Sequence, residues 1–146
     1  MIHRGIRNLH GKMGMRFFIA LLILCCVPSV AQENSEFPQW METASQSVGR
    51  LILSIQSKDS GEATAAARVL QEVFGEVAAH FESRGAGGAV KYAKAAKEGF
   101  QNVEGLIAAG KFDEAYTEVQ ATRSNCDHCH KAHREKSSDG SYRIKY

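Results

Sequence analysis

The chain has 146 residues, of which 44% are hydrophobic and 23% are charged, with 18 basic and 16 acidic side chains. A chain of this size suits one domain with a single hydrophobic core. The small excess of basic residues excludes the strongly basic proteins that bind nucleic-acid backbones, so we expect no nucleic-acid partner.

Residues 1–31 read as an export signal. An apolar run over 17–27 is followed by Pro28 and the small-residue end Ser29-Val30-Ala31, and four basic residues precede it: Arg4, Arg7, Lys12 and Arg16. This order is typical of a signal peptide that is cleaved, here after Ala31. The apolar run is well short of the ~20 residues that span a membrane. We therefore expect export without stable membrane insertion, and an uncleaved anchor is the alternative.

Removal of residues 1–31 changes the charge and the cysteine content. The remaining chain has 14 basic and 16 acidic residues, a net charge of −2. Cys25 and Cys26 leave with the signal, so Cys126 and Cys129 are the two cysteines that remain. They do not make the disulfide framework that an exported protein can have.

The remaining cysteines belong to the stretch Cys126-Asp127-His128-Cys129-His130. Cys-x-x-Cys-His is the attachment signal for c-type haem: two thiols add to two vinyl groups of one porphyrin, and the histidine reaches the iron. In a helix the three ligating positions lie at i, i+3 and i+4, on one face. The motif predicts one covalent haem c, inserted by haem-attachment machinery in the periplasm. The alternative is a haem-free metal site that recruits His128 or His133.

The rest of the exported chain reads as helices joined by short breaks. Apolar residues recur in steps of three and four in four segments. The first covers about 35–57, the second runs from the break at 58–61 to about 83, and the others cover about 89–109 and 113–136. No strand pattern appears. Ser35 and Asp113 are candidate N-caps, and Gly110 is a candidate C-cap. We expect an all-α, antiparallel up-down-up-down four-helix bundle over 32–136, with the haem near the C-terminal end of the fourth helix and a polar tail over 137–146.

A haem-attachment signal in the last helix of an exported four-helix protein resembles the cytochrome c-prime family, the class II cytochromes c. The resemblance covers residues 36–136, and its specific motif is Cys126 to His130, extended by Arg134. The family usually has an aromatic residue where this chain has His133. Class I cytochromes c take a methionine from downstream of the signal, and this sequence has none there. The family's low-spin branch takes an axial methionine from the first helix, which implies Met41 here.

Helix geometry independently supports Met41 as the second ligand of the haem iron. In an antiparallel bundle the start of the first helix lies beside the end of the fourth, and with ~1.5 Å rise per residue Met41 and His130 lie at similar depth. An ordinary core methionine is the simplest alternative, and His80 is the rival ligand. Candidate haem-lining aromatic residues are Phe37, Trp40, Phe81, Tyr92 and Phe100. Arg134 is a candidate partner for a haem propionate or for the end of the last helix.

These features predict a single-electron carrier that serves periplasmic redox partner proteins and is not an enzyme. The first alternative is a five-coordinate haem protein that binds small gases, as typical members of the family do. The second is a haem-free protein that binds metal through Cys126, Cys129, His130 and His133. A basic edge formed by Lys91, Lys94 and Lys97 is either a solvated face or a docking patch. The resemblance also leaves a homodimer through the first two helices open.

Overall fold

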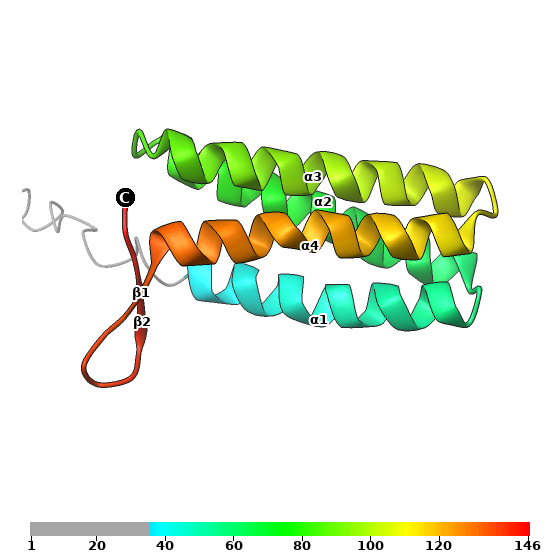
Figure 1. The fold of residues 1–146 in the computed structure, drawn as a ribbon, viewed down its shortest axis with the longest axis horizontal. Helices are drawn as coiled ribbons and strands as arrows, with labels where there is room; N and C mark the ends of the chain where they lie inside the picture. Colours follow the sequence, from blue (N-terminus) through cyan, green and yellow to red (C-terminus); the bar gives the residue numbers. More distant parts are fainter. Residues whose placement is uncertain (1–35) are drawn as a thin grey trace, which may run out of the picture. The chain divides into compact units, whose positions relative to one another are not determined.

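The computed structural model describes residues 36–146; the expected export signal over 1–31 and the expected N-cap Ser35 lie outside the described residues. Four helices, α1 (Glu36–Gln56), α2 (Ser60–Glu82), α3 (Gly87–Ala108) and α4 (Phe112–His133), run alternately up and down with short connections (Figure 1). The prediction of an all-α four-helix bundle is confirmed. No helix within residues 36–146 is both long enough and apolar enough to cross a membrane.

The apolar stripes of the four helices meet in one core. Its largest fully buried side chains are Leu51, Leu70, Phe81, Phe100, Val103, Ile107 and Val119. Phe74 and Phe100 stack at the centre, with 5.8 Å between ring centroids. The helix pairs α1–α2, α2–α3 and α3–α4 pack closely, whereas α1 and α4 make far fewer contacts with each other. That looser pair leaves the bundle open along one side.

Local capping chemistry is seen at the start of α2 and after the end of α3, and one expected cap is wrong. The Asp59 carboxylate caps α2, because its Oδ1 accepts a hydrogen bond of 3.0 Å from the backbone N–H of Glu62. After Ala109 closes α3, Gly110 adopts the left-handed conformation, with φ of 73°, that favours glycine after a helix. The expected N-cap at Asp113 is wrong: α4 begins at Phe112, and the N-cap position is Lys111.

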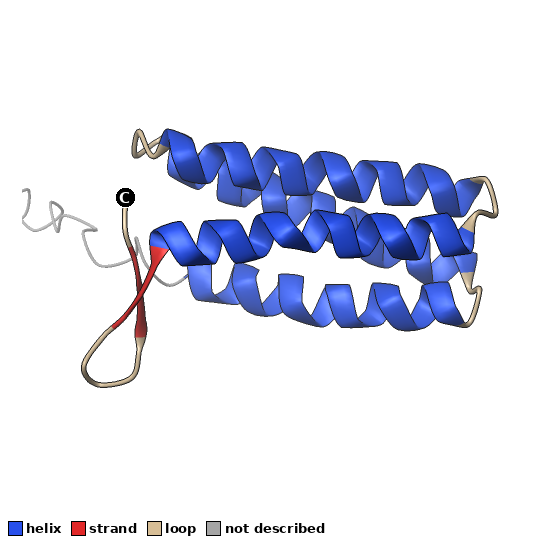
Figure 2. Cartoon of the chain, in the orientation of Figure 1, coloured by secondary structure: helices blue, strands red, loops and turns tan. Residues whose placement is uncertain are grey.

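The end of the chain also differs from the expectation. The fourth helix ends at His133 rather than near Lys136, and β1 (Arg134–Lys136) pairs antiparallel with β2 (Tyr142–Ile144) in a hairpin (Figure 2). The expectation of no strand is therefore wrong. The backbone N–H of Lys145 donates to the carbonyl of His133 at 2.8 Å, and the Arg134 guanidinium lies 4.4 Å from the centroid of the Tyr142 ring. These contacts stabilise the turn away from the helix.

Helices α3 and α4 approach each other closely at Gly99. A Cβ added there would overlap Thr122 Oγ1 and would lie 2.7 Å from Thr122 Cγ2. Thr122 is itself buried, so its side chain has little space into which to move. The absence of a side chain at Gly99 sets the separation of these two helices.

We expect Gly99→Ala to lower the free energy of unfolding by about 1–3 kcal/mol, because the added methyl overpacks the contact with Thr122. Gly105→Ala is the matched control on the same helix, since a Cβ there meets nothing within 4 Å. It should raise the free energy of unfolding by up to ~1 kcal/mol through helix propensity. Urea denaturation followed by circular dichroism measures both. Equal stabilisation by the two changes would contradict this account of the α3–α4 contact.

Candidate functional site

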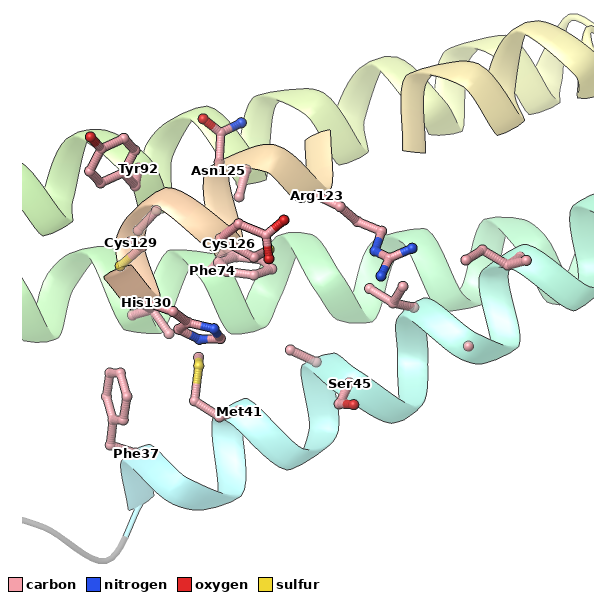
Figure 3. Close-up of a pocket in the computed structure, with 18 residues that line it drawn as sticks. Phe37, Met41, Ser45, Phe74, Tyr92, Arg123, Asn125, Cys126, Cys129 and His130 are labelled. Atoms are coloured by element: carbon pink, nitrogen blue, oxygen red, sulfur yellow. The ribbon is translucent and has the colours of Figure 1, made fainter. Parts of the chain in front are cut away.

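A cleft of about 420 Å³ lies on the open side of the bundle between α1 and α4 (Figure 3). Its volume falls in the range typical of sites for small molecules and cofactors. Much of its wall is apolar or small: Phe37, Ala44, Val48, Gly49, Ile52, Phe74, Val77, Ala93 and Ala96. The cleft is thus a largely apolar space that one helix pair leaves unfilled.

Helix α4 contributes three chemically reactive side chains to this cleft. Cys126, Cys129 and His130 all line it, and all three are partly buried. Their spacing of i, i+3 and i+4 places them on one helical face, and close packing of α4 against α3 orients that face. The structure thus places all three side chains along one wall of the cleft.

Burial shifts the pKa values of all three side chains. Burial raises the pKa of the Cys126 thiol to about 11, with further increases from the Asp127 carboxylate and from Cys129. Burial also raises the pKa of Cys129. For His130, burial lowers the pKa and the positive charge of Arg134 lowers it further, while Asp127 opposes both. At neutral pH the imidazole is therefore uncharged, with a nitrogen lone pair available to a metal.

Met41 lies on the opposite wall of the cleft. Its side chain extends from α1, and its sulfur points toward the His130 imidazole on α4 (Figure 3). Both residues line the same cleft, as the depth argument predicted. Met41 is only partly buried, so it is a residue of the cleft wall rather than of the closed core.

His80, the rival ligand, lies outside the cleft lining. Its Nε2 is 3.2 Å from the hydroxyl of Tyr146, and its ring packs against Phe37 and Trp40 with centroids 5.1 and 5.7 Å away. These contacts place His80 in an aromatic cluster at the end of the bundle. Phe81 belongs to the same cluster: it is buried beside Phe37, at 5.6 Å between centroids. Of these residues, Phe37 reaches the cleft and Phe81 does not.

Arg134 also lies outside the cleft lining, exposed on β1 with its guanidinium over Tyr142. Its effect on the site is electrostatic, through the pKa of His130. His133 turns toward the hairpin, where its Nδ1 is 3.1 Å from the carbonyl oxygen of Lys145.

Within residues 36–146 no three histidine, cysteine, aspartate or glutamate side chains converge as a metal site requires. Cys126, Cys129, His130 and His133 are therefore not arranged as the ligand set of a single metal ion.

The sequence analysis did not predict two features of the site. Arg123 lines the cleft one turn before Cys126, and extending the helical face of the motif backwards by three residues would have found it. Tyr92 lines the cleft as expected, but its ring also stacks on His128, with centroids 5.9 Å apart and planes 14° apart. No sequence pattern indicates that second contact, because the two residues come from different helices.

No match is found when the chain is compared with protein-family models, with curated proteins or with solved structures.

The raised thiol pKa values predict slow alkylation of the folded chain with both thiols free. At pH 8, Cys126 should react with iodoacetamide roughly a hundredfold more slowly than a free cysteine, because only the thiolate reacts. The urea-unfolded chain is the control and should react at the ordinary rate. Mass spectrometry of timed samples measures both, and equal rates in the two states would contradict the burial of Cys126.

The same pKa shift has a consequence for stability. A thiol with a folded-state pKa of about 11, above the unfolded value near ~8.5, stabilises the fold fully below pH ~8.5. This stabilisation is lost as the pH rises through about 11. Thermal unfolding at pH 8 and pH 10.5 should show a lower Tm at the higher pH, and a Cys126→Ala variant should show a smaller decrease.

Proposed function

We propose that the cleft holds one haem c, bound by thioether bonds from Cys126 and Cys129, and that the protein is an exported single-electron carrier of the cytochrome c-prime type. In this proposal His130 and Met41 would be the two protein ligands of the iron. One observation carries it: the three groups of the attachment motif line one side of a largely apolar cleft, and Met41, the only methionine of residues 36–146, points at His130 from the other side.

The residues fit the chemistry of covalent attachment. Each thioether would form by addition of one cysteine S–H across one vinyl group, with the sulfur on one carbon and the hydrogen on the other, so nothing would be oxidised or reduced overall. Two free thiols three residues apart on one helical face match the two vinyl groups of one porphyrin in number and spacing. Bound haem supplies an iron that alternates between the ferrous and ferric states and so stores one electron.

The protein's own contribution is to orient the ligands and to exclude water. His130 is neutral and fixed on a packed helix, and Met41 supplies a soft thioether from a helix that belongs to the same bundle. Histidine and methionine ligation raises the reduction potential of haem relative to other ligand pairs. Apolar residues around the ligands limit rearrangement of solvent when the charge of the iron changes.

The second candidate function is binding of small gases at a five-coordinate iron. It is supported by the small residues Ala44, Ser45 and Gly49, which line the cleft on the helix that carries Met41. A methionine side chain is unbranched and flexible, so it can leave the iron if space allows. Whether Met41 binds the iron therefore distinguishes an electron carrier from a gas-binding protein.

Met41→Leu tests the ligand assignment, because leucine keeps the volume and removes the sulfur. We expect the holoprotein to change from a low-spin to a high-spin spectrum and the ferrous form to gain carbon monoxide binding. Val48→Ala is the matched control, since Val48 lines the same cleft on α1 and has no ligating atom. It should keep the low-spin spectrum. An unchanged spectrum in Met41→Leu would overturn ligation by Met41.

The proposal places the protein in the periplasm, where haem-attachment machinery acts on exported chains. The signal that supports this localisation lies in residues 1–31, which are outside the described residues. Its physiological partners in this proposal are periplasmic redox proteins that donate or accept one electron.

A further inference from the structure

One end of the cleft is aromatic. Phe37 lines the cleft there, one turn before Met41 on α1, and it packs against Trp40 and Phe81 with 6.1 and 5.6 Å between ring centroids. Those two rings support Phe37 from outside the lining. A wall of this kind suits the apolar part of a ligand, whereas burial of a carboxylate against it would be costly.

The opposite end of the cleft carries a cation. The Arg123 side chain extends from α4 toward α1, beyond Ser45 as seen from Met41 (Figure 3). Arg123 precedes His130 by seven residues, so with a rise of ~1.5 Å per residue the two lie about 10 Å apart along α4. This separation is comparable with the distance from the iron of a haem to the carboxylates at the edge of its porphyrin.

The Arg123 guanidinium has hydrogen-bond donors that the protein leaves unused. Its Nη1 donates a hydrogen bond of 3.2 Å to Oε1 of Gln120 on the same helix, whereas a guanidinium has five N–H donors in all. Among residues 36–146 no carboxylate forms an ion pair with Arg123, including Asp127, which follows one turn later and also lines the cleft. The Arg123 side chain is exposed. It can therefore meet an anion in the cleft without displacing a packed residue.

The charge of Arg123 also acts on the motif. Burial, Asp127 and Cys129 raise the pKa of the Cys126 thiol, and the positive charge of Arg123 opposes them. No lysine and no other arginine lines the cleft within the described chain, and His130 is uncharged. Arg123 thus supplies the one positive charge of this part of the cleft wall.

Arg134, the expected partner of a haem propionate, is placed differently. It lies on β1, outside the cleft lining, with its guanidinium 4.4 Å from the centroid of the Tyr142 ring. Of the two arginines that flank the attachment motif in sequence, Arg123 is therefore the one that faces the cleft.

We propose that Arg123 binds a propionate carboxylate of the haem and compensates its negative charge at this end of the cleft. The inference rests on the proposed function and names the residue that holds the charged edge of the same group. A guanidinium can bind a carboxylate through two parallel N–H···O bonds, and such charge-assisted bonds are stronger than neutral ones. The pairing suits the cleft to a group that is apolar over most of its surface and charged at one edge.

Resonance Raman spectroscopy of the ferrous holoprotein tests the contact through a propionate bending mode, whose frequency falls when a propionate loses a hydrogen-bond donor. Arg123→Gln should lower this frequency, because it removes the charge and the paired donors. Arg123→Lys keeps the charge alone and should give an intermediate frequency. Arg134→Gln is the matched control: it removes the same charge outside the cleft and should keep the wild-type frequency.

Two outcomes of the Raman experiment would overturn the proposal. An unchanged propionate mode in Arg123→Gln would mean that Arg123 does not hold the carboxylate, as expected if it pairs with Asp127 in the holoprotein instead. A mode that changes in Arg134→Gln, alone or to the same extent, would assign the carboxylate to Arg134 or to general charge.

The pH dependence of the reduction potential gives a second readout. Ferrous haem holds a propionate proton more tightly than ferric haem, so the potential falls as the pH rises through the ionisation of a propionate. An opposite charge within ~4–6 Å lowers the pKa of a carboxyl group by about 1–3 units. Arg123→Gln should therefore move this step to higher pH by about one unit or more. Arg134→Gln should leave it in place.

Asp127→Asn identifies the group that titrates, because Asp127 is the carboxylate of the chain that lines the cleft within the described residues. The pH-dependent step should persist in this variant. Its loss would assign the step to Asp127, and an equal shift in Arg123→Gln and Arg134→Gln would assign it to general charge; either result would overturn the proposal.

The proposed function and the propionate contact fail in different ways. A matured chain that carries no covalent haem would overturn the proposed function and the role of Arg123 with it. A haem-loaded protein whose propionate mode and pH-dependent step do not respond to Arg123→Gln would overturn the role of Arg123 alone.

Discussion

The close approach of α3 and α4 at Gly99 is the contact on which the geometry of the site depends. Thr122 packs against Gly99 and precedes Cys126 by one helical turn, so this contact sets the position of the attachment motif. Helix α1 is held on the other side through α2, and it packs only loosely against α4. The three well-packed helix pairs thus hold apart α1 and α4, between which the cleft opens.

This arrangement lets few residues define the proposed ligand set. Three of the four come from five consecutive positions of α4, where helical periodicity alone brings them to one face. The fourth, Met41, comes from a helix nearly ninety positions away, and only the antiparallel topology brings it opposite His130. The burial that makes the cleft apolar also keeps Cys126 protonated and His130 neutral. Burial of this part of α4 therefore accounts both for the apolar cleft and for the uncharged state of the two side chains.

Periodicity was sufficient to predict the helices, the bundle and the shared depth of Met41 and His130, because these depend on spacing alone. The end of α4 could not be predicted in this way. Its departure into the hairpin depends on the backbone bond between Lys145 and His133 and on the stacking of Arg134 over Tyr142, which join residues far apart in sequence without a repeating pattern. The same contacts explain why Arg134 lies outside the cleft. Phe81 was placed at the correct end of the bundle, but the sequence does not show that Phe37 lies nearer the cleft.

The central claim is that Cys126 and Cys129 together anchor one haem in the cleft between α1 and α4. Denaturing mass spectrometry of the exported protein, produced in a host with haem-attachment machinery, tests it most directly. The account predicts a mass increased by one haem that survives denaturation and is absent from the Cys126→Ala, Cys129→Ala double variant. A wild-type protein with the mass of the bare polypeptide, produced in a host that loads a known c-type cytochrome, would contradict it.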